Sequence, residues 1–252
     1  MATLLLASTL AAAQAGLTPP RIGFLRDSTG NVRALLGISG NFWLGAPVVG
    51  SAVSLASSGK ASMLKTGESL RVLNALGHPL GRDWIASGPA LFAFTPSGAP
   101  ALAWLPDSGH LLRWNGLRFE PARTNLSELD GLVVSLAAPE PARAAFVVQR
   151  DQQLWRIDLS LFDGAILFAA ALPGASAPAL LLPDGSLVYT GKSAMILRDP
   201  EGHERTIAFN LAPVQFIPMG HDWILIETSQ PHNQFVLRLS TGALFQLPGV
   251  AE

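Results

Sequence analysis

The chain has 252 residues, of which 49% are hydrophobic and only 14% are charged, against roughly a quarter charged in an average soluble domain. Its net charge of −1 and the absence of any lysine or arginine run argue against nucleic-acid binding driven by phosphate neutralisation. It contains no cysteine, which excludes disulfides, thiolate metal ligands and cysteine nucleophiles. The 24 glycines and 19 prolines predict many short strands and turns.

The N-terminal segment predicts export to the periplasm or the extracellular space. Residues 2–13 form an apolar run that is too short to span a bilayer but has the length of a signal-peptide core. Residues 13–15 (AQA) have the small-x-small form of a cleavage site, so residues 1–15 are interpreted as a signal peptide without the usual basic start. The alternative is that residues 2–18 form strands of the fold itself. No later stretch has the length and apolarity of a membrane helix.

A short sequence unit recurs six times: an apolar pair, a basic residue, and a polar turn that contains glycine. The basic residues are Arg26, Lys65, Arg113, Arg156, Arg198 and Arg238, and the turn glycines are Gly30, Gly67, Gly116, Gly164, Gly202 and Gly242. The glycines are 37, 49, 48, 38 and 40 residues apart, close to the roughly 40–50 residues that a four-stranded propeller blade takes. We interpret the basic residues as solvated outward side chains rather than as a ring that captures an acidic partner.

Each unit is expected to contain two hairpins, with strands A and B near the centre and strands C and D outside. The recurring glycine turns are assigned to the C–D hairpins, and the stretch after each glycine to strand D. The clearest A–B hairpin is Ala179–Leu182 followed by the turn Pro183-Asp184-Gly185 and by residues 186–189. Similar pairs of apolar stretches occur at residues 91–104, 132–148 and 214–226.

These units predict an all-β fold: a single β-propeller domain over residues 20–250, built from four-stranded antiparallel blades. Five full units and a leading C–D hairpin at residues 21–38 predict six blades, one of them incomplete or completed by the N-terminal segment. Five blades with an extra hairpin is the alternative. A β-sandwich would not explain a period near 42 residues, and radial closure avoids long exposed sheet edges.

Residues 182–189 (LPDGSLVY) resemble the strand–turn–strand element of bacterial propellers of the NHL, gluconolactonase-like and beacon-repeat kinds. Residues 106–109 (PDSG) are similar in a looser way, and the resemblance of the repeat pattern covers about residues 20–248. It implies a superfamily and no single family, because the Trp-Asp ending of WD40 repeats and the glycine doublets of kelch repeats are absent. The gluconolactonase likeness implies a divalent metal held in the central channel by carboxylate and Asn ligands.

The candidate ligand-binding residues come from the two longest expected connections and from turns on the same face. Residues 77–89 and 121–131 are predicted to be long D–A connections, and long loops on a rigid scaffold concentrate binding residues. Together with B–C turns they contribute His78, Arg82, Asp83, Trp84, His110, Asn125, Asp130, Lys192 and His232. The alternative for Trp84 is a plug that covers the channel. His203 and His221 are expected on the opposite face.

No catalytic or metal constellation is predicted. The three histidines of the chosen face belong to different blades and lack a metal-ligand spacing. The sequence has no nucleophile elbow, phosphate loop or dinucleotide fingerprint. Glu227 follows three apolar strand residues, and it is either a buried channel acid with a raised pKa or a solvent-facing side chain.

The favoured function is therefore an exported, non-catalytic binding module for a protein, peptide or glycan, with no cofactor and no nucleic-acid partner. A metal-assisted hydrolase or lactonase with a central-channel site is the first alternative. A structural blade array within a larger assembly is the second.

Overall fold

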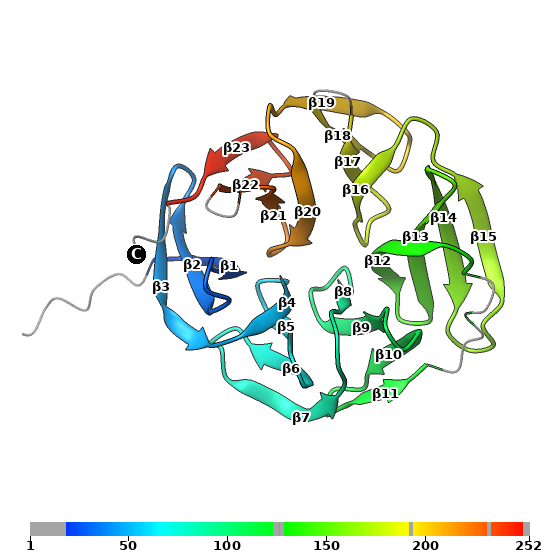
Figure 1. Cartoon of the computed structure of the whole chain (residues 1–252), viewed down its shortest axis with the longest axis horizontal. Coiled ribbons are helices and arrows are strands. Elements are labelled where there is room, and N and C mark those ends of the chain that lie inside the picture. Colours follow the sequence, from blue (N-terminus) through cyan, green and yellow to red (C-terminus); the bar gives the residue numbers. More distant parts are fainter. Residues whose placement is uncertain (1–18, 123–125, 127–128, 192–193, 231–232, 249–252) are drawn as a thin grey trace, which may run out of the picture.

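The computed structural model describes residues 19–122, 126, 129–191, 194–230 and 233–248. In these residues, strands β1 to β23 form six antiparallel sheets arranged radially around a central axis, and there is no helix (Figure 1). The prediction of an all-β propeller with six blades is confirmed. In blades 2 to 6 the first strand is innermost, and the strands are called A to D from the axis outward; the three described strands of blade 1 take positions B, C and D.

The strands of each blade follow the chain order. Blade 1 has three described strands, β1 (Arg21–Arg26), β2 (Val32–Ile38) and β3 (Asn41–Val49). Blade 2 consists of β4 (Ala52–Ser57), β5 (Ala61–Thr66), β6 (Ser69–Asn74) and β7 (Pro79–Ile85). Blade 3 consists of β8 (Leu91–Phe94), β9 (Pro100–Leu105), β10 (His110–Trp114) and β11 (Phe119–Pro121). Blade 4 consists of β12 (Leu132–Glu140), β13 (Arg143–Arg150), β14 (Gln153–Ser160) and β15 (Ile166–Ala171). Blade 5 consists of β16 (Ser176–Leu181), β17 (Leu187–Thr190), β18 (Ala194–Arg198) and β19 (Glu204–Ala208). Blade 6 consists of β20 (Pro213–Pro218), β21 (Trp223–Thr228), β22 (Gln234–Arg238) and β23 (Ala243–Gln246).

The repeat marks hairpins correctly, but its strand assignment is wrong in the first two blades. The turn glycines of blades 3 to 6 lie in C–D turns, as expected. Gly30, however, lies between β1 and β2, and Gly67 lies between β5 and β6. β1 begins beside the ends of β4 and β20, at Ser57 and Met219, and ends beside Val53 at the start of β4, so it runs opposite to these inner strands and takes position B. The leading hairpin at residues 21–38 is therefore the B–C hairpin of blade 1, and β3 is its strand D. An apolar strand that ends in a glycine turn identifies a hairpin without saying which hairpin of the blade it is.

The core is a ring of apolar layers between neighbouring blades. Inner strands such as β8 and the end of β16 are buried on consecutive residues, because blades pack against both of their faces. Trp104 of blade 3 meets Phe146 of blade 4 edge to face at 6.0 Å. Phe209, which follows β19 of blade 5, meets Phe235 of blade 6 in the same way at 5.2 Å. Each interface is thus a sheet-on-sheet contact held by side chains.

Blades 1 and 6 close the ring through side chains. Phe42 of β3 packs edge to face on Trp223, at 5.8 Å, and on Phe245, at 5.6 Å. At the other end of β21, Arg26 forms an ion pair with Glu227 at 3.3 Å. Glu227 therefore lies between two blades, and the expectation that it is either a channel acid or a solvent-facing residue is wrong. Its half-buried arginine partner satisfies the charge of this mostly buried carboxylate.

No described strand of blade 1 reaches the channel, because blades 2 and 6 meet in front of β1. Ser57, at the end of β4, and Met219, just after β20, form a parallel bridge, and the Gly220 amide donates to the Ser57 carbonyl at 3.0 Å. These two strand ends pass in front of Gly23 of β1, where a Cβ would come within 2.5 Å of Met219 Cγ. Glycine allows this close approach. Among the described residues, six blades therefore surround a channel whose wall is made by the inner strands of five.

The recurring basic residues are mostly at the surface or paired, but Lys65 is not. Arg113 is exposed, whereas the other four arginines pair with carboxylates: Arg26 with Glu227, Arg156 with Asp158, Arg198 with Glu204, and Arg238 with Asp222. Lys65 is completely buried on β5, which corrects the expectation of a solvated side chain. Its ammonium donates to the Thr66 carbonyl, its one hydrogen-bond acceptor in the described part of the chain. Burial lowers the pKa of Lys65, while the charge of Asp107 acts in the opposite direction.

Replacing Lys65 by Met should stabilise the fold by roughly 1–2 kcal/mol, because a methionine of similar length removes a desolvated charge that has a single acceptor. The pKa of Lys65 is lower in the folded than in the unfolded chain, so the unfolded chain binds more protons and the wild type gains stability as the pH rises toward about 10.4. Urea unfolding at several pH values measures both effects. A K65M variant that is less stable than the wild type at pH 7 would show that the ammonium is well accommodated.

Candidate functional site

The channel opens into its larger cavity on the face formed by the A–B and C–D turns, which we call the AB face. This AB cavity has a volume of about 700 Å³. The ends of the inner strands of blades 2 to 6 contribute to its wall, and no described residue of blade 1 lines it. Phe94 of β8, Leu136 and Ala137 of β12, and Leu181 of β16 are buried side chains of its floor.

A second cavity of about 500 Å³ lies at the starts of the inner strands. It opens on the opposite face, formed by the D–A connections and B–C turns, which we call the DA face. Leu132 and Val214, which are 62% and 53% exposed, lie at its rim. The two cavities share Phe92, Leu136, Leu180 and Pro218. These apolar side chains form a waist in the middle of the channel.

The polar groups of the AB cavity are concentrated on blade 6. The β20–β21 turn contributes His221 and Asp222, and the start of the β22–β23 turn contributes Ser240 beside Arg238. Inner strands must be apolar because they are packed on both faces, whereas the turns that follow them reach solvent and can be polar. A polar rim above an apolar floor is the direct result, and such a cavity suits a ligand that is mainly apolar.

Asp222 is held in a fixed ion pair. Its Oδ2 accepts hydrogen bonds from Arg238 Nε at 2.8 Å and from Ser240 Oγ at 2.7 Å, and its Oδ1 accepts from the Ser240 amide at 2.7 Å. Burial would raise the pKa of Asp222, but the hydrogen bonds from Ser240 and Arg238 outweigh it and lower the pKa below its usual value. The Arg238 guanidinium also lies 5.7 Å from the centre of the Trp223 ring. This pair is therefore a rigid, neutral part of the rim.

His221 and Asp184 are the exposed ionisable groups of the rim. Asp184 accepts hydrogen bonds from the Ser186 amide at 2.9 Å and from the Ser186 hydroxyl at 3.0 Å, which confirms that it is a turn residue. His221 makes no hydrogen bond to other described residues and is free to meet a ligand. The sequence pattern places His221 on the AB face correctly, but nothing in its spacing indicates that it borders a cavity.

One of the two long connections expected on the DA face, residues 77–89, lies elsewhere for most of its length. His78 is in the turn between β6 and β7, which is a C–D turn, so it belongs to the AB face and not to a D–A connection. Residues 79–85 form β7, the outermost strand of blade 2, and not a loop. An outer strand that is exposed along most of its length has the polar composition of a loop, which explains the error.

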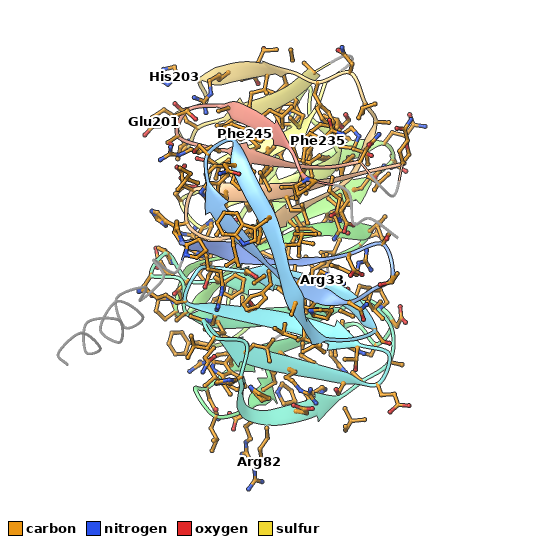
Figure 2. All side chains as sticks on the ribbon, turned by 90° about the vertical axis from the view of Figure 1, so that its left-hand side faces the viewer. Arg33, Arg82, Glu201, His203, Phe235 and Phe245 are labelled. Carbon is orange, nitrogen blue, oxygen red and sulfur yellow. The ribbon has the colours of Figure 1, made fainter. Side chains whose placement is uncertain are left out.

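Arg82, Asp83 and Trp84 are brought together, but at the rim of the disc. They line a shallow groove of about 570 Å³ with residues 118–121 of blade 3. Asp83 pairs with Arg71, and Trp84 is half-buried against the core cluster that includes Phe119. Arg82 points away from the body of the molecule (Figure 2).

Two of the remaining candidates lie on the DA face, and the others fall outside the described residues. His110 begins β10 after a B–C turn, and Asp130 precedes β12 in a D–A connection; both are exposed on the expected face. Neither residue borders the DA cavity. Asn125, Lys192 and His232 lie outside the described residues, as does the candidate signal peptide, residues 1–15.

One group of potential metal ligands occurs in the described part of the chain. Asp199, Glu201 and His203 place ligand atoms within 4.8 Å of one another in the β18–β19 turn. Figure 2 shows Glu201 and His203 at the edge of the molecule. The Asp199 carboxylate and His203 Nδ1 lie 2.9 Å apart. This exposed turn is not part of the channel wall, where the gluconolactonase likeness would place a metal.

Truncating Trp84 to Ala should destabilise the fold by about 2 kcal/mol, because the half-buried indole packs on the core and a cavity or groove would replace it. Thermal unfolding measures the effect. Arg82→Ala, on the same strand but pointing to solvent, is the control and should leave the melting temperature almost unchanged. Equal, small effects of the two variants would show that Trp84 is free for another role.

Comparisons with known proteins agree with this architecture. The chain matches no protein-family model, and no curated protein matches it in sequence. The structure of TolB from Acinetobacter baumannii is similar, with a TM-score of 0.55, 14% identity and coverage of 92% of this chain. This chain spans 64% of the TolB chain, less than two thirds of it. A chain of the nidogen–laminin complex has a TM-score of 0.56 and 11% identity over 89% of this chain and 91% of that one.

Both similar structures are β-propeller proteins, and at these identities they show the fold that the chain shares with them. The described residues include no helix with the length and apolarity needed to cross a membrane. The chain is a six-bladed β-propeller with a cavity of about 700 Å³ at the AB end of its channel.

Proposed function

We propose that the chain is a non-catalytic binding module that takes an apolar segment of a protein or peptide partner into the AB cavity. The observation that carries this proposal is the cavity itself: about 700 Å³ with buried apolar side chains as its floor and a polar rim on blade 6. Concave, mostly apolar sites with a few fixed polar groups are typical of ligand pockets.

A protein or peptide fits this cavity better than a glycan does. Sugar hydroxyls need hydrogen-bond partners, and leaving them unpaired in an apolar site costs free energy. Floor residues such as Phe94, Leu136 and Leu181 offer no side-chain partner. An aliphatic or aromatic side chain would give up only its hydration shell there and would leave no hydrogen-bonding group unpaired. The polar rim would then hydrogen-bond the backbone of the same segment.

The propeller fold also supports a role in protein binding. The nidogen–laminin structure is a complex between two proteins, and one of its chains has this fold. The neutral Asp222–Arg238 pair is already satisfied, so it can border a partner without a further desolvation cost for an unpaired charge. His221 is the rim side chain with free hydrogen-bonding groups, and we assign it the polar contact with the partner.

Two histidine variants on opposite faces test the assignment. The apolar dye ANS and peptides selected from a displayed library against the folded chain serve as probes, and fluorescence titration measures their binding. His221→Ala should weaken the binding by roughly fivefold, equivalent to about 1 kcal/mol, because it removes a rim contact. His110→Ala removes an exposed histidine from the DA face and should leave the affinity unchanged.

A loss of binding in the His110 variant and not in the His221 variant would contradict the choice of the AB cavity. Apolar probes that bind only the unfolded chain would contradict a binding role for the channel. Selected peptides without any large apolar side chain would contradict the proposed partner chemistry.

We also propose that the chain is exported. The support is the apolar run at residues 2–13 followed by the small-x-small site that ends at Ala15. Expression in an export-competent host should give a periplasmic or secreted product whose N-terminus is Gly16, measured by N-terminal sequencing or intact mass. A soluble product retained inside the cell with residues 1–15 intact would contradict this.

A further inference from the structure

The outermost strand of blade 4 exposes an uninterrupted apolar segment. On β15, Ile166, Leu167 and Phe168 are 42%, 53% and 45% exposed, and the strand continues as three alanines. Phe162, in the turn before it, is 78% exposed. Figure 1 shows β15 at the periphery of the disc, with β14 as its neighbour on the inner side. Contiguous exposed apolar side chains of this kind mark interaction surfaces.

The other outer strands carry features that discourage pairing with a further strand. β7 contains Arg82 and Asp83, β11 has three residues including Glu120 and Pro121, β19 contains Glu204 and Arg205, β3 contains Pro47, and β23 packs through Phe245 against blade 1. Charges, proline, short length and coverage are the usual protections of sheet edges. β15 carries no charge and no proline in its six residues.

The backbone of β15 is able to accept another strand. The Leu172 amide donates to the Leu154 carbonyl of β14 at 2.8 Å, and pairing with β14 is regular from Phe168 to Ala171. Hydrogen-bonding direction alternates along an antiparallel strand. The N–H and C=O groups of Ala171 and Ala169 therefore point away from β14, toward the edge that no described strand covers.

We propose that this edge binds the β15 strand of a second copy of the chain, antiparallel, about a two-fold axis at Ala169. This register brings the outward-facing groups of both strands opposite one another. It also places Phe168 opposite Ala170, so that a large side chain lies across from a small one, while Leu167 occupies the bulge at which the pairing with β14 shifts. The strand is thus complementary to itself in backbone and in side-chain size, and an uncharged edge meets no like-charge repulsion in its own copy.

The size of the contact sets its strength. Each of the three large side chains has on the order of 100 Å² left to bury, from its exposed fraction and the area of a large apolar residue. Two copies together bury less than the roughly 1,200–2,000 Å² of a stable interface. The dimer therefore forms and dissociates with concentration, and a continuous sheet of two blades is its core.

The absence of cysteine makes the test direct. In an Ala169→Cys variant, the two thiols would lie across a hydrogen-bonded pair with Cα atoms about 5.5 Å apart, within the range of a disulfide. Mild oxidation should cross-link this variant into a dimer, seen on a non-reducing gel. Thr206→Cys, at an exposed position of the outer strand β19, is the matched control and should stay monomeric.

Light scattering after gel filtration tests the same contact without a cross-link. The wild type should move toward twice the monomer mass as its concentration rises, whereas Ala169→Lys and Leu167→Lys should stay monomeric and Thr206→Lys should behave as the wild type. A mixture of A169K and A169D should recover the dimer. A wild type that is monomeric at all concentrations, a dimer that survives A169K, or equal cross-linking of both cysteine variants would overturn the proposal.

Discussion

The propeller is held closed by the contact between blades 1 and 6. A propeller built from consecutive blades is a closed object only if its first and last blades hold together. In the described residues no strand is shared between them, so side chains supply the closure: the Phe42, Trp223 and Phe245 cluster and the Arg26–Glu227 pair. The Gln234 side chain adds a hydrogen bond to the Arg26 carbonyl at 3.0 Å. A ring closed this way distributes stability over many modest contacts.

The manner of closure also shapes the channel. Because Ser57 and Met219 bridge in front of β1, blades 2 and 6 become neighbours at the channel wall, and blade 1 contributes to stability without reaching the cavity. The rim of the AB cavity follows from this. Trp223 packs on Phe42 in the cluster that closes the ring, and it also lines the AB cavity. Arg238 lies over the Trp223 ring. Residues that close the ring therefore also position the polar rim, which makes the site as rigid as the closure.

The fold was predictable from sequence because each blade repeats the same local pattern of strands and turns. Apolar runs followed by glycine turns at a period near 42 residues leave few alternatives to a propeller. The strand assignment within a blade was harder, because Gly30, Gly67 and Gly116 follow similar apolar stretches, yet the first two lie in B–C turns and the third in a C–D turn. The burial of Lys65 could not be predicted from the repeat for the same reason. A basic residue at the end of a hairpin strand faces solvent in one strand of the blade and the core in another.

The candidate site was less predictable than the fold because a cavity depends on convergence between turns that are far apart in sequence. Polar composition pointed to residues 79–85, but an exposed outer strand and a binding loop need the same composition, and only the outer strand is present there. Asp184 and His221 belong to two ordinary A–B turns in neighbouring blades, and the radial arrangement alone places both at one cavity. With charged side chains so sparse, most of those described are engaged in pairs or turns. β15 is exposed but has no charged side chain and no turn residue. Its exposure is therefore explained better by a contact with another molecule than by solvation.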